Sequence, residues 1–151
     1  MLLPKKEIRM TKQIPNPLRI GKTLGAFNVD KNGPQMFMDL KAIEEKAQRI
    51  SKVLGVDLSP EDVALFTFLH EMSHYRQWKE GRVSIKDMRD TKFKDSERGK
   101  AIELEADASA VEFIRKTIGY GKKWTKRSLQ AMIGAEKTLT LEKARDLGII
   151  S

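Results

Sequence analysis

Residues 70–74 read His70-Glu71-Met72-Ser73-His74, and they lie inside residues 60–79, which have the pattern of a helix. Residues four apart on a helix project from one face, so His70 and His74 can present their imidazoles to one metal ion. Glu71 is turned by about 100° from His70, close enough to reach a water molecule on that ion without being a ligand. The chain has no other histidine. This stretch predicts a metal-binding helix.

The alternative is that both histidines are ordinary residues of an amphipathic helix. Two buried histidines without a metal need hydrogen-bond partners, and the sequence does not identify them. The isolation of both histidines around one glutamate favours the metal site.

A zinc site with an open position for water needs a third protein ligand. No cysteine and no third histidine are present, so this ligand has to be a carboxylate. The helix predicted to end at Ile118 carries Glu103 and Asp107, four apart on one face. Without a nearby cation these carboxylates repel each other by about 0.2–0.5 kcal/mol. The alternative is a solvated acidic face, balanced by Arg98 and Lys100.

His70-Glu71-x-x-His74 followed by Glu103-x-x-x-Asp107 resembles the pattern of gluzincin zinc metallopeptidases. The chain length and the Glu-x-Glu-Ala-Asp-x-x-Ala pattern of residues 103–110 are most similar to the small single-domain members called minigluzincins. The likeness covers residues 60–119. It implies a zincin-like fold and one zinc ion per chain, with His70, His74 and Glu103 as ligands, Glu71 as general base and Asp107 as the acceptor that orients a ligand histidine.

The chain departs from the larger gluzincins in two ways. These have a strand between the supporting helix and the active-site helix that binds substrate along its edge. Here only residues 55–59 lie between those helices, so such a strand has to come from residues 23–38. The larger members also have a downstream histidine or tyrosine that stabilises the oxyanion. The candidates here are Tyr75, Tyr120 and an arginine such as Arg115, and Tyr120, between two glycines, is preferred.

The helical register distinguishes Glu103 from Glu105. The two glutamates point about 200° apart on a helix, so they cannot both face the metal. Asp107 lies one turn after Glu103 on the same face, where it can orient a ligand histidine. Glu105 shares its face with Ala101 and Ser109, a row that is predicted to be solvated and to offer no partner for a ligand histidine. We therefore predict Glu103 as the third ligand.

Outside these two helices, the sequence predicts a mostly helical α+β fold with a small antiparallel sheet. A turn signal at residues 31–34, between two strand-like runs, predicts a β-hairpin within residues 23–38. The two helices already described are predicted at 60–79, after Ser59-Pro60, and from Ser96 or Lys100 to Ile118. Further helices are predicted at 39–54, between Asp39 and Gly55, and near 126–133 and 140–147. Residues 82–95 are a polar stretch.

The 151 residues divide into a basic, extended N-terminal arm (1–22), a zincin-like metallopeptidase domain (23–121) and a basic-to-neutral helical segment (122–151) expected to pack on or near that domain. The net charge is +8, and residues 115–127 carry six basic and no acidic residues. The basic flanks suit non-specific binding of nucleic acid, while a well-solvated surface is the simpler explanation. The sequence predicts no oligomeric state.

The absence of cysteine excludes a disulfide scaffold, a thiol nucleophile and a thiolate metal site. No apolar stretch is long enough for a membrane span or typical of a secretory signal, so we expect a cytoplasmic protein without a membrane partner.

The leading hypothesis is a zinc-dependent metalloendopeptidase acting on a peptide or protein substrate. It can be latent if a terminal arm fills the cleft. The alternatives are a regulatory intracellular peptidase acting on a nucleic-acid-associated protein, and a non-catalytic zinc-stabilised protein that binds nucleic acid. Glu71 argues against the last, because a purely structural zinc site needs no general base.

Overall fold

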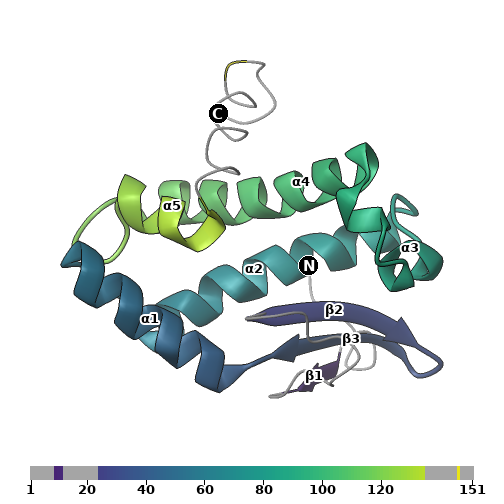
Figure 1. The fold of residues 1–151 in the computed structure, drawn as a ribbon, viewed down its shortest axis with the longest axis horizontal. Helices are drawn as coiled ribbons and strands as arrows, with labels where there is room; N and C mark the ends of the chain where they lie inside the picture. The colour runs from purple at the N-terminus through teal and green to yellow at the C-terminus, as the bar shows by residue number, and fades with distance from the viewer. Residues whose placement is uncertain (1–8, 12–23, 135–145, 147–151) are drawn as a thin grey trace.

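The computed structural model describes residues 9–11, 24–134 and 146 (Figure 1). It contains a small sheet and several helices packed around one long central helix. The strands are β1 (Arg9–Thr11), β2 (Gly25–Asp30) and β3 (Gly33–Met38). The helices are α1 (Leu40–Leu54), α2 (Pro60–Lys79), α3 (Ile85–Arg89), α4 (Glu97–Phe113) and α5 (Lys126–Ile133), with a 3₁₀ turn at Phe93–Asp95 and a π-helical turn at Ile114–Ile118. The predicted mostly helical α+β fold is confirmed.

The sheet has the order β1-β3-β2. β2 and β3 form the predicted antiparallel hairpin, in which Asp30 lies opposite Gly33 and Val29 opposite Pro34. β1 pairs with β3 in parallel. This strand falls within the arm predicted at 1–22, and three residues are too few to show the alternation that identifies a strand. β2 is therefore an edge strand within the described sheet.

The helices begin and end at the residues that the sequence signals. Asp39 caps α1 by accepting from the backbone N–H of Ala42, and Gly55, with φ of 64°, ends that helix in the left-handed region. Ser59 and Asp62 form a reciprocal capping box at the start of α2. Ser96 caps α4. The short helix α3 and the turn at 93–95, in contrast, lie in the stretch that was expected to be only polar.

α2 lies between the sheet and α4, and α1 packs beside it (Figure 1). Alanines at 106, 108 and 110 are almost completely buried, so small side chains allow α4 to approach α2 closely. Trp124 and Leu129 belong to the same core as Ile43 and Phe66, which joins residues 124–133 to the rest of the domain. The helix predicted at 140–147 lies outside the described residues.

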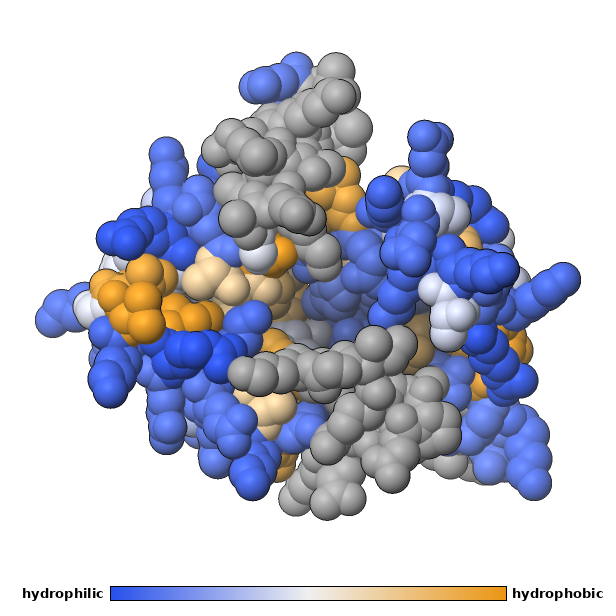
Figure 2. All heavy atoms as spheres, in the orientation of Figure 1, coloured by the Kyte–Doolittle hydropathy of each residue, from blue (hydrophilic) through white to orange (hydrophobic). Residues whose placement is uncertain are grey.

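Hydrophilic side chains cover most of the described surface in Figure 2. The large apolar side chains that are exposed, such as Val53 and Phe113, are separated along the chain. None of the described helices combines the length and the apolar character that a membrane span requires.

Substitution of Trp124 tests whether the segment 124–133, which includes α5, is part of the core. The Trp124 side chain is 0% exposed and its ring centroid lies 6.1 Å from that of Phe66 on α2. We expect Trp124→Ala to lower the free energy of unfolding by about 3–5 kcal/mol, because it leaves a large cavity. Urea denaturation measures this. The control Val53→Ala, at a side chain 73% exposed, should change it by less than about 0.5 kcal/mol. If both substitutions lowered the free energy of unfolding equally, the buried position of Trp124 would be contradicted.

Candidate metal centre

Three side chains from two helices converge on one point. His70 and His74 project from α2, and Glu103 projects from α4. The Nε2 atoms of the two histidines lie 3.1 Å apart. The Glu103 carboxylate lies 3.2 Å from His70 Nε2 and 3.1 Å from His74 Nε2. The sequence placed these three residues on two separate helices, and the structure brings them together.

The spacing of these atoms fits a tetrahedral ion. Two ligand atoms that are each about 2.1 Å from a tetrahedral zinc ion lie about 3.4 Å apart. The histidine nitrogens lie 3.1 Å apart, and each lies 3.2 or 3.1 Å from a different oxygen of Glu103. With one donor atom taken from each residue, all three lie within 4.8 Å of one another. Two imidazole nitrogens and one carboxylate oxygen are also ligands that zinc accepts. The donor set therefore fits a divalent ion.

Hydrogen bonds on the far side of each ring orient the two histidines. Nδ1 of His70 lies 2.8 Å from Oδ1 of Asp107, and Nδ1 of His74 lies 2.8 Å from Oε1 of Gln77. A carboxylate and an amide oxygen only accept, so both Nδ1 atoms carry the proton. Both Nε2 atoms then direct a lone pair at the same point as the Glu103 carboxylate. Such an arrangement needs a cation, which is either a proton or a metal ion.

Gln77 is the residue of this site that sequence reasoning missed. It follows His74 by three residues, on the helix face that also carries the histidines, and it is completely buried. A buried glutamine needs hydrogen-bond partners, which was the available signal. Asp107, in contrast, lies where the family resemblance implied, on the face of α4 that carries Glu103.

Glu71 lies beside the cluster and does not belong to it. Its carboxylate is 3.9 Å from His70 Nε2, and the residue is 5% exposed. Burial raises the pKa of Glu71, although the two histidines act in the opposite direction. A carboxyl group with a raised pKa next to a metal position is suited to accept a proton near neutral pH.

Charges within the cluster shift the pKa values of its members in opposite directions. Burial disfavours the charged forms, but hydrogen bonds to Asp107 and Glu103 outweigh it and raise the pKa of His70 well above its usual value. The pKa of His74 is raised against burial by its hydrogen bond to Glu103. The pKa of Glu103 is lowered against burial by its hydrogen bonds to both histidines. Without a metal, the site therefore retains protons, and a metal ion has to displace them.

Glu105 points away from the cluster, as the helical register requires, but it is not on a solvated row without partners. It accepts from Gln77 Nε2 at 3.2 Å, and the guanidinium of Arg82 donates to its two oxygens at 2.7 and 2.5 Å. The expectation of a solvated row was therefore wrong at Glu105, although Glu105 contacts neither ligand histidine directly. The cause is the packing of α2 against α4, which brings the α2 residue Gln77 to Glu105.

The structure does not bring the oxyanion candidates to the cluster. Tyr120 is 51% exposed and is not among the residues that line the site cavity. Tyr75 is buried against Phe27 and Trp78, and its hydroxyl is 3.2 Å from the Lys79 amine. Arg115 pairs with Glu112. Tyr120 as the oxyanion group stays a prediction.

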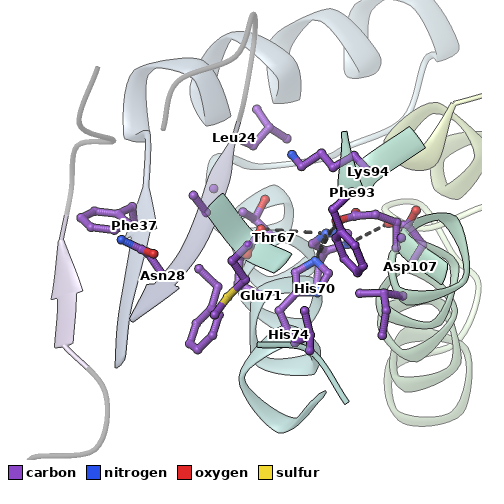
Figure 3. A pocket seen from close by; sticks show the side chains of 18 of the residues that line it. Leu24, Asn28, Phe37, Thr67, His70, Glu71, His74, Phe93, Lys94 and Asp107 are labelled. Atoms are coloured by element: carbon purple, nitrogen blue, oxygen red, sulfur yellow. Dashed lines mark hydrogen bonds and ion pairs between the residues drawn. The ribbon is translucent and has the colours of Figure 1, made fainter. Parts of the chain in front are cut away.

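The cluster opens onto a cavity of about 790 Å³. β2 borders this cavity on one side and α4 on the other, and His70, Glu71 and His74 lie between them (Figure 3). Lys94, on the segment that precedes α4, also lines the cavity, and its positive charge lowers the pKa of Glu71 slightly against the effect of burial. The open side of the cluster thus has room for a ligand.

No family model, curated protein or solved structure matched the chain. The assignment therefore depends on the residues themselves. Their arrangement is consistent with a metal site of the His-Glu-x-x-His type.

The different positions of Glu103 and Glu105 generate the first prediction for this site. Glu103→Ala should abolish binding of a divalent ion, because one of three ligands is lost. Glu105→Ala should retain the metal with an affinity reduced by at most about 10–100-fold, the usual effect of an outer hydrogen-bonding group. Competition with a chromophoric chelator measures both affinities. If Glu105→Ala lost the metal and Glu103→Ala kept it, the ligand assignment would be wrong.

The raised histidine pKa values predict how pH affects the metal-free protein. The unfolded histidines titrate near pH 6.5, and the folded ones titrate higher. Their contribution to stability is thus complete below about pH 6.5 and is lost as the pH rises through the folded pKa values. The raised pKa of Glu71 also makes the stability fall as the pH rises. The lowered pKa of Glu103 affects the stability only at acid pH.

We therefore expect the free energy of unfolding in chelator to fall as the pH rises above about 6.5, as measured by urea denaturation. With a saturating divalent ion in place of the protons, this fall should disappear. A metal-free stability that rises over the same range would contradict the geometry of the cluster.

Proposed function

We propose that this protein is a zinc-dependent metallopeptidase. The observation that carries the proposal is the combination of three converging ligands with a buried carboxylate that is not one of them. A purely structural zinc site has four protein ligands and no open position, whereas a catalytic site has three and keeps one open. Here three donors face a cavity, and Glu71 borders the open side. The resemblance to gluzincins agrees with this arrangement.

His70, His74 and Glu103 would hold the zinc ion. When bound, zinc supplies a Lewis acid that polarises a carbonyl oxygen and lowers the pKa of water towards about 7. Glu71 accepts the proton of the attacking water and later delivers it to the departing amine. Asp107 keeps the His70 ring in the orientation that directs Nε2 at the ligand position.

The edge of β2 supports an extended peptide as substrate. Pro34 has no N–H, so Val29 opposite it belongs to a pair that makes no ladder hydrogen bonds. By alternation, Gly25 and Phe27 also direct their backbone N–H and C=O groups towards the outer edge of β2. These groups border the cavity and can pair with an extended chain, as in β-strand addition. They are the part of this site that selects a peptide backbone.

Gly25 allows this edge to lie close to the catalytic helix. A Cβ atom at this position would come within 2.6 Å of Thr67 Cγ2 and 3.1 Å of the Phe37 carbonyl oxygen. A side chain there would push β2 away from α2. The glycine therefore allows the proposed substrate edge to lie close to Glu71.

Glu71→Gln tests the proposed mechanism. We expect this variant to bind zinc and to unfold like the wild type, because the amide has the same shape and Glu71 is no ligand. Peptide hydrolysis should fall by at least about 100-fold, since the general base is lost. Digestion of a peptide library, with mass-spectrometric detection, measures the rate.

Turnover by this variant equal to that of the wild type would contradict the mechanism. If the wild type cleaves no peptide, deletion of residues 1–8 or 135–151, which keeps β1 and the core residues of 124–133, tests whether either terminal segment blocks the cleft. Zinc binding without hydrolysis in all three forms would favour the non-catalytic alternative, in which the basic flanks bind nucleic acid.

A further inference from the structure

Gln77 uses its whole side-chain amide inside the protein. The residue is 0% exposed. Its Oε1 lies 2.8 Å from His74 Nδ1, and its Nε2 donates to the Ile102 carbonyl oxygen at 3.0 Å and to Glu105 Oε1 at 3.2 Å. Burying an amide costs free energy unless its hydrogen bonds are made, and here each of its heteroatoms has a partner. One partner is a proposed ligand, and the other two lie on the helix that carries Glu103.

We propose that Gln77 is a positioning residue that fixes the tautomer and orientation of His74 for metal binding. Ile102 and Glu105 offer only acceptors, so the NH₂ group must face them and the amide oxygen must face the imidazole. His74 then carries its proton on Nδ1 and directs the Nε2 lone pair at the cluster. This inference rests on the metal-binding part of the proposed function and does not depend on peptide hydrolysis.

Arg82 and Glu105 hold the other end of this hydrogen-bonded chain. The guanidinium contacts both oxygens of Glu105, and the bidentate hydrogen bond lowers the pKa of that carboxyl group. Glu105 therefore stays ionised and remains an acceptor for the Gln77 amide. The chain runs from a half-exposed arginine through Glu105 and Gln77 to His74, and it crosses the interface between α2 and α4. It also fixes Ile102, the residue before Glu103.

The two histidines thus have different partners, and this difference has a physical reason. Asp107 supports His70 with a carboxylate, whereas Gln77 supports His74 with a neutral amide. Glu71, Glu103 and Asp107 already bring three carboxylates to the site. A fourth at position 77 would face Glu105 directly and repel it. A neutral acceptor orients His74 without that repulsion.

Zinc affinity, measured at one fixed pH by competition with a chromophoric chelator, tests the assignment. Gln77→Met has a similar shape and no acceptor, and we expect it to bind zinc about 10–100-fold more weakly.

Ser128→Ala is the matched control, because it also removes a completely buried polar group but lies on α5, outside the residues that line the site cavity. It should lower the melting temperature and leave zinc affinity unchanged. Gln77→Met with zinc affinity within twofold of the wild type would overturn the proposal.

A measurement without metal separates this inference from the proposed function. The chain has only two histidines, so ¹⁵N-histidine labelling gives two ring systems to assign. In metal-free protein at alkaline pH, where the rings are neutral, we expect His74 to be protonated on Nδ1 in the wild type and on Nε2 for a substantial fraction in Gln77→Met. This result would support the role of Gln77 even if the wild type bound no zinc. An unchanged tautomer in the variant would refute it.

Discussion

Three electron-pair donors that face one point between α2 and α4 are the constraint on which the rest of this structure depends. Two imidazole nitrogens and a carboxylate about 3.1 Å apart repel one another unless a cation joins them. The protein holds them there through buried groups behind each ring, Asp107 and Gln77. The buried alanines of α4 allow the two helices to approach closely enough for this contact. The close packing of α2 against α4 is therefore what brings the mutually repelling donors together in this fold.

The sequence predicted the parts of this arrangement that depend on periodicity within one element. His70 and His74 share a face because they are four apart, and the same rule placed Glu103 and Asp107 together. The helix boundaries at Asp39, Gly55 and Ser59 followed from capping chemistry, and the hairpin from its turn residues. In each case a local rule was enough, because the cause lies within a few residues of its effect.

The sequence did not predict what depends on contacts between elements. Gln77 and Glu105 lie 28 positions apart, and only the packing of α2 on α4 shows that they meet. The parallel pairing of β1 with β3 joins residues that no local pattern relates. The short helix α3 occurs in a polar stretch, where propensity alone does not distinguish a five-residue helix from a loop. The contact between Gln77 and Glu105 and the pairing of β1 with β3 were missed because their partners are far apart along the chain, whereas α3 was missed because its local signal is weak.

The hairpin that precedes α1 provides the edge proposed to bind substrate and also contributes to the burial of Glu71. β2 packs on α2 at Gly25, where a Cβ atom would lie 3.4 Å from Glu71 Cγ. This close approach helps to exclude water from Glu71, and burial is the main cause of its raised pKa. The strand that can pair with a peptide backbone therefore also adjusts the proton affinity of the group proposed to activate water. A bulkier residue at position 25 would disturb both properties together, which explains why a glycine suits the first position of this strand.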